Sequence, residues 1–86
     1  MANVEEVKLS VAASVDVAQR AVAGVQAVSA EMDEALTRLR LAAVGSFHPA
    51  AAAAIAHLEQ ARTRLDEAVQ LTHAAVDSAN QFRSMI

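Results

Sequence analysis

The three histidines are the residues best suited to chemistry. His73 and Asp77 stand four positions apart, which on a helix places them on one face, where they could share a metal ion or a proton. A metal site in a helical bundle needs several ligands, typically from Glu-x-x-His motifs on paired helices. The residues three positions before the histidines are Gly45, Ala54 and Gln70, so this motif is absent. We therefore expect no metal site and no cofactor, and we interpret His73 and Asp77 as a surface pair.

Nucleophilic and acid–base catalysis also lack their usual partners in this chain. No serine stands in a Gly-x-Ser-x-Gly elbow, and the chain has no cysteine. The two glycines lie far apart, so they form no phosphate-binding loop. Neighbouring carboxylates such as Asp33–Glu34 and Asp66–Glu67 point in different directions on a helix. The sequence therefore predicts a protein that is not an enzyme.

The composition argues against several classes of partner. The chain has 86 residues, enough for one small domain, and a net charge of −3. The negative charge argues against a nucleic-acid partner. No run of about 18 apolar residues is present, so we expect no membrane insertion. Glu5 and Glu6 occupy the place of the basic segment of a signal peptide. We expect a cytoplasmic protein, or one secreted without a cleaved signal peptide.

The segment of about 3–44 has the pattern of one long helix. Apolar residues recur every three to four positions from Val4 to Ala43, which places them on one face. Asn3 is suited to cap the first turn, and Glu6 stands in the capping-box position. Gly24 is the one weak point within the segment and costs about 1 kcal/mol relative to alanine.

The motif Gly45-Ser46-Phe47-His48-Pro49 predicts a turn. Gly45 suits the left-handed position after a helix end, and Pro49 suits the first turn of the next helix. Either Ser46 or His48 is suited to cap that second helix, over about 49–84. We expect Phe47 to fold back over the ends of both helices. Because the turn over 45–48 is short, the helices must run antiparallel, so that 1–86 form a single all-α, two-helix hairpin.

Apolar residues recur every three to four positions in the second helix as well, and they form a second stripe. We expect the charged residues opposite this stripe to face solvent. Among them, Arg62 is close enough in sequence to pair with Glu59 and with Asp66. The large apolar residues of the two stripes are the predicted interface. They are Val11, Val15, Val22, Val25, Met32, Leu36, Leu39, Ile55, Leu58, Leu65, Val69, Val76 and Phe82.

Further apolar residues lie beside or off these stripes, more than one seam between two helices can cover. A lone hairpin would leave them in water, and exposed patches of this kind mark binding surfaces. We therefore expect a homodimer or heterodimer that forms a four-helix bundle. Phe82, Met85 and Ile86 either close the open end of the bundle or form a recognition tail. The additional apolar residues are Leu9, Val17, Val28, Leu41, Val44 and Leu71.

The hairpin pattern and the stretch "VGSFHPA" resemble the small helical hairpins of the WXG superfamily, which are associated with type VII secretion. Gly45 and Phe47 stand where that family has a Trp-x-Gly turn, although the order differs and the tryptophan is missing. The C-terminal tyrosine motif of the family is missing too, because the chain contains no tyrosine. The usage of alanine, valine and arginine resembles that of actinobacterial proteins.

The resemblance implies a non-enzymatic protein–protein interaction module. Such a hairpin would be exported by a type VII secretion system or would escort one of its substrates. Its partner would be a second copy of itself, a related hairpin or a larger effector. The alternative is an intracellular homo-oligomeric scaffold or adaptor with no export role, which the missing tyrosine motif favours.

Overall fold

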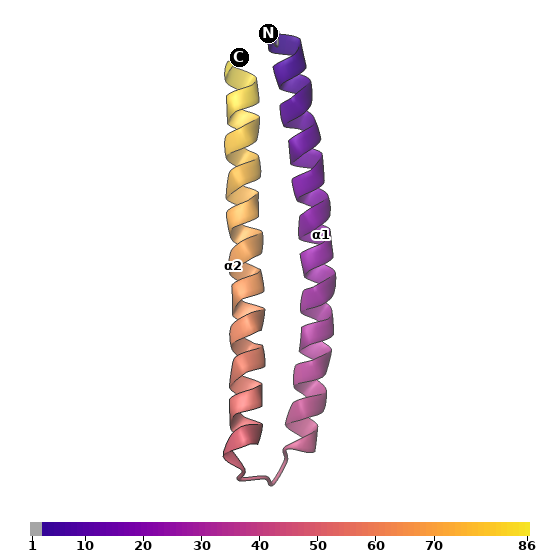
Figure 1. Cartoon of the computed structure of the whole chain (residues 1–86), viewed down its shortest axis with the longest axis vertical. Helices are drawn as coiled ribbons and strands as arrows, with labels where there is room; N and C mark the ends of the chain where they lie inside the picture. Colours follow the sequence, from indigo (N-terminus) through magenta and orange to yellow (C-terminus); the bar gives the residue numbers. More distant parts are fainter. Residues whose placement is uncertain (1–2) are drawn as a thin grey trace.

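In a computed structural model that describes residues 3–86, the chain forms two long helices, α1 (Val4–Ala42) and α2 (Pro49–Met85). The helices run antiparallel and side by side, with the turn at one end and both termini at the other (Figure 1). The hairpin measures 64 × 18 × 15 Å. The predicted all-α, antiparallel two-helix hairpin is confirmed.

Local capping sets the start of α1. Asn3 has an extended backbone, and its side-chain Oδ1 accepts a hydrogen bond from the backbone N–H of Glu6 at 2.8 Å. This bond satisfies one of the amide groups that the first helical turn leaves without a partner. Glu5 and Glu6 also place negative charge at the positive end of the helix dipole. Gly24 does not interrupt α1, which continues through it without a break.

The turn is held by backbone groups and two polar side chains. Helix α1 ends at Ala42, two residues before the expected end, and Gly45 follows with a left-handed φ of 77°. The N–H of Ser46 donates to the carbonyl of Ala43 at 2.9 Å, and Ser46 Oγ accepts from the N–H of His48 at 3.3 Å. Of the two candidate caps, His48 is the one that caps α2, because its Nδ1 accepts from the N–H of Ala50 at 3.0 Å.

Phe47 does not cover the helix ends. Its side chain is 98% exposed, so the expectation that it folds back over both helices is wrong. The polar groups at the helix ends are already paired with Ser46 and His48, and the intervening backbone crosses the gap in an irregular, non-helical conformation. Phe47 therefore projects from the tip of the turn into solvent.

The contact between α1 and α2 is a seam of residues that recur with alternating steps of three and four. The buried residues Val22, Ser29 and Leu36 of α1 are seven positions apart, and Val76 is buried in α2. This heptad spacing is typical of an antiparallel coiled coil. The central seam residues are Val11, Val15, Ala18, Val22, Val25, Ser29, Met32, Leu36, Leu39 and Ala43 on the α1 side, and Ile55, Leu58, Arg62, Leu65, Val69, Thr72, Val76, Ala79 and Arg83 on α2.

The predicted interface residues fall in this seam with one exception. Val22, Leu36 and Val76 are buried, and the other large apolar residues predicted there are half-buried. Phe82 lies outside the seam and is 50% exposed, because Arg83, seven positions after Val76, holds the seam position instead. Helix α2 continues to Met85, one residue past its expected end.

Candidate functional site

The heptad register gives the hairpin two unlike faces, one on each side of the seam. Each heptad contributes two seam residues, for example Val22 and Val25 in α1. In a coiled coil, the residue just before the first of the two lies on one side of the seam, and the residue just after the second lies on the other side. The flank formed by the residues after the second seam position is called the polar face here. Its members are Gln19, Gln26, Asp33 and Arg40 in α1 and Glu59, Asp66, His73 and Asn80 in α2.

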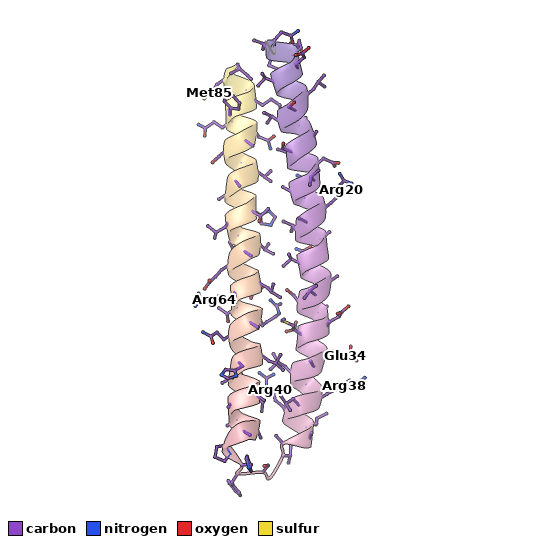
Figure 2. All side chains as sticks on the ribbon, viewed as in Figure 1. Arg20, Glu34, Arg38, Arg40, Arg64 and Met85 are labelled. Carbon is purple, nitrogen blue, oxygen red and sulfur yellow. The ribbon has the colours of Figure 1, made fainter. Side chains whose placement is uncertain are left out.

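The polar face carries ion pairs that join the two helices. Arg62 Nε donates to Asp33 Oδ1 at 3.0 Å, and its Nη1 also donates to Asp66. Near the turn, Arg40 Nη2 donates to Glu59 Oε1 at 2.8 Å, and Arg40 lies between the helices in Figure 2. The two cross-helix pairs add to the packing of the seam, and because their carboxylates are more than half exposed, their contribution is small.

The sequence predicted that Arg62 faces solvent, and this prediction is wrong. Its side chain is only 28% exposed, because position 62 lies in the seam, seven residues after Ile55 and seven before Val69. Hydrogen bonds to Asp66 and then to Asp33 raise the pKa of Arg62 above its ordinary value. The predicted pairing of Arg62 with Asp66 is present, whereas Glu59 pairs with Arg40 instead of Arg62.

A hollow of about 380 Å³ lies on the polar face beside Arg62. His73 is on its wall, but no hydrogen bond or ion pair joins His73 to Asp77 within residues 3–86. The same described part of the chain contains no group of three histidine or carboxylate side chains arranged for a metal ion. Both Asp33 and Asp66 already accept hydrogen bonds from Arg62. The charged groups of the hollow therefore pair with one another. The lining residues are Gln26, Ser29, Ala30, Asp33, Arg62, Asp66, Val69, Gln70 and His73.

The opposite side of the hairpin carries no charge over its open half, and we call this region the uncharged face. It comprises the residue just before the first seam residue of each heptad. It also includes the residue that stands three positions after that one. Its members are Val7, Ser10, Ser14, Val17, Ala21, Gly24 and Val28 in α1 and Ala68, Leu71, Ala75, Ser78, Phe82 and Met85 in α2.

Large apolar side chains are exposed on the uncharged face. The exposed fractions are 56% for Val17, 44% for Val28, 72% for Leu71, 50% for Phe82 and 76% for Met85. A single hairpin thus leaves five large apolar side chains in water on one face, without a charged residue among them. Exposed apolar groups gathered in this way are typical of a binding surface.

A shallow apolar groove runs between the helices on this face. It has a volume of about 150 Å³, and Ser14 and Ala75 form its edges above the seam residues Val15, Ala18, Val76 and Ala79. The Ser14 hydroxyl donates to the carbonyl of Ser10 at 3.0 Å, so covering the groove would not leave this donor unpaired. An apolar surface could therefore cover the groove without burying an unpaired hydroxyl donor of Ser14.

The remaining exposed apolar residues lie elsewhere. Leu9 and Leu41 are each 70% exposed, and their heptad positions place them on the back of α1 or toward the polar face. Val44 is 78% exposed and lies in the turn, after the end of α1. The tail residues Phe82 and Met85 belong to the uncharged face, and together with Ile86 they are exposed in the single hairpin. Whether they close the open end of a bundle or form a recognition tail stays a prediction. Neither helix of the described chain combines the length and apolar content that a membrane span requires.

Sequence reasoning missed two residues of the seam. Ser29 is 6% exposed, and Arg62 bridges the helices, yet neither is apolar and both were left out of the stripes. Their spacing carried the signal, because Ser29 stands seven positions from both Val22 and Leu36. The heptad also separates the polar face from the uncharged face.

No family model, curated protein or solved structure matches the chain.

Proposed function

We propose that the chain is a non-enzymatic protein–protein interaction module and that the uncharged face is the surface through which it binds. The single observation that carries this proposal is the set of five exposed apolar side chains on a face without charge. Covering apolar surface is favourable at roughly 25 cal/mol per Å², so burial of these five side chains against a partner would stabilise a complex.

The two faces divide the work in this proposal. Ion pairs on the polar face join α1 and α2 beside the apolar seam, and their carboxylates remain in contact with water. The uncharged face contributes little to the hairpin itself, because its large side chains remain exposed there. A partner gives these side chains the burial that two helices alone do not provide.

The resemblance to WXG hairpins adds a cellular role to the proposal. In that role the module is exported by a type VII secretion system or escorts a substrate of such a system. The support is the size of the hairpin, its central turn at Gly45 and its unpaired apolar face. The alternative role is an intracellular scaffold or adaptor that uses the same face.

A photoreactive amino acid at position 71 tests the interaction function in cells of the organism that encodes the chain. Leu71 is 72% exposed on the uncharged face, and Leu41, 70% exposed on the back of α1, is the matched control. We expect irradiation to yield a protein adduct from position 71 and far less from position 41. Equal yields from both positions, or none from either, would refute the use of this face.

Fractionation of the same cultures tests the export role. A tagged chain found outside the cell only when the type VII secretion system is intact supports export. A chain that stays inside cells with an intact system contradicts export of the chain itself and leaves the escort of a secreted substrate and the scaffold as the remaining roles.

A further inference from the structure

We propose that the partner of the uncharged face is a second copy of the chain. In this dimer two hairpins stack face to face with their turns at the same end, so that α1 of each copy lies on α2 of the other. This inference rests on the proposed function, because it names the partner of the same face. All neighbouring helices in the resulting four-helix bundle run antiparallel.

The heights of residues along the hairpin decide which side chains would meet. Val15 and Ala18 of α1 line one groove with Ala79 and Val76 of α2, and Asp33 contacts Arg62, so residues at the same height have numbers that add up to about 95. The long side chain of Arg40 reaches Glu59 about one helical turn away from its own height. Because both helices advance equally per residue, Gly24 lies level with Leu71, and Ser10 lies level with Met85. A two-fold axis parallel to the long axis of the hairpin leaves the height of every residue unchanged. Each residue of the uncharged face therefore meets the residue of the other copy that lies at the same height.

At five of six levels along the uncharged face, a large side chain then meets a small one, and at the sixth Ala21 meets Ala75. Leu71 meets Gly24, the largest difference in size along the face. Such alternation lets the facing layers interdigitate without voids or clashes. The facing pairs between copies are Val28 with Ala68, Gly24 with Leu71, Ala21 with Ala75, Val17 with Ser78, Ser14 with Phe82 and Ser10 with Met85.

Gly24 has no role within the single hairpin. Its backbone is helical, and a Cβ atom placed on it would meet nothing within 4 Å. Glycine is less favourable than alanine inside a helix, so the fold alone gives no reason for it. The stacked dimer supplies one, because Leu71 of the second copy sits over this position.

Charge complementarity selects the same orientation. Glu31 and Arg64 follow the uncharged face toward the turn and lie level with each other, so Glu31 of each copy faces Arg64 of the other. Glu31 forms no ion pair within residues 3–86, while Arg64 reaches only its neighbour Glu67, at 3.2 Å. A full-length stack with the turns at opposite ends would instead set Glu31 on Val17.

The face is large enough for a stable dimer. The side of the hairpin that a full-length stack covers measures 64 by 18 Å, which is about 1,150 Å² on each copy or about 2,300 Å² in all, and the uncharged face on the open half supplies about half of it. That half alone lies near the lower end of the usual range for specific interfaces. The size of the interface therefore poses no obstacle to a self-paired bundle.

The test measures the mass of the purified full chain by light scattering over a range of concentrations, together with two leucine variants. We expect a dimer that Leu71→Glu dissociates, with a dissociation constant at least about 100-fold higher, because each copy would bury an unpaired carboxylate. Leu41→Glu, at an equally exposed leucine, should leave the dimer intact. Circular dichroism checks that both variants remain helical.

A monomeric wild-type chain would overturn the self-pairing, as would a dimer that Leu71→Glu leaves intact. A monomer whose position 71 still gives adducts with another protein in cells would leave the proposed function standing, so the two failures are distinguishable. Spin labels on Ser46→Cys test the orientation. The two labels of a dimer should lie much closer than half of the 64 Å length, and a separation near that full length would overturn the turn-to-turn stack.

Discussion

Substitutions at Gly24 separate the stability of the hairpin from the stability of its dimer. In the monomeric Leu71→Glu background, we expect Gly24→Ala to stabilise the fold, because the backbone is helical and the new Cβ meets nothing within 4 Å. The gain in helix propensity is about 1 kcal/mol. For a domain of this size, it corresponds to a rise in Tm of about 4–8 °C. Thermal unfolding followed by circular dichroism measures it.

The larger variant Gly24→Leu should have the opposite effect on the dimer of the otherwise wild-type chain. Its side chain has open space in the single hairpin but would occupy the place of Leu71 from the second copy. Overpacking costs about 1–3 kcal/mol at each site, and the two-fold axis creates two such sites. The dissociation constant should therefore rise at least about 30-fold.

Sedimentation at several concentrations measures this change, with Leu9→Ile as a control at an exposed position off the uncharged face. A Gly24→Leu chain that dimerises as tightly as wild type would refute the placement of Leu71 over Gly24. A fall in Tm for Gly24→Ala in the monomeric background would refute the statement that the fold itself does not need this glycine.

Three further experiments test the fold. A double-mutant cycle of Asp33→Asn and Arg62→Gln should give a favourable coupling free energy that falls at high salt. Strictly additive effects would contradict the bridge across the helices. Gly45→Ala should lower the free energy of unfolding by about 1–2 kcal/mol, because the φ of 77° at this position is costly for a residue with a Cβ. Urea unfolding measures the change, and an unchanged midpoint would argue against the left-handed turn. Phe47→Ser should change that free energy by less than about 0.5 kcal/mol, and a larger loss would show that the ring packs against the protein.

The overall fold could be predicted from the sequence because its signals are local. Asn3 and Pro49 mark helix starts, and Gly45 marks the end of the first helix, each through the geometry of its own backbone and side chain. The choice between Ser46 and His48 as the cap of α2 depends on the turn geometry, so it had to come from the structure.

The faces of the hairpin were harder to predict, because they depend on which residues form the seam. A stripe chosen by residue type alone omits Ser29 and Arg62, and without them the heptad is broken in both helices. Once both are included, Leu71 and Leu41 fall on different sides although they are equally exposed. The position of Phe47 could not be inferred either, since nothing near it in sequence specifies a packing partner.

Hydroxyl-radical footprinting of the purified chain tests most directly whether a second copy covers the uncharged face. Leu71, Leu9 and Leu41 are 72%, 70% and 70% exposed in the single hairpin, so they should react alike in a monomer. At concentrations where the dimer forms, we expect Leu71 to react several-fold more slowly than Leu9 and Leu41. Equal reactivity of all three leucines at every concentration would contradict a covered uncharged face.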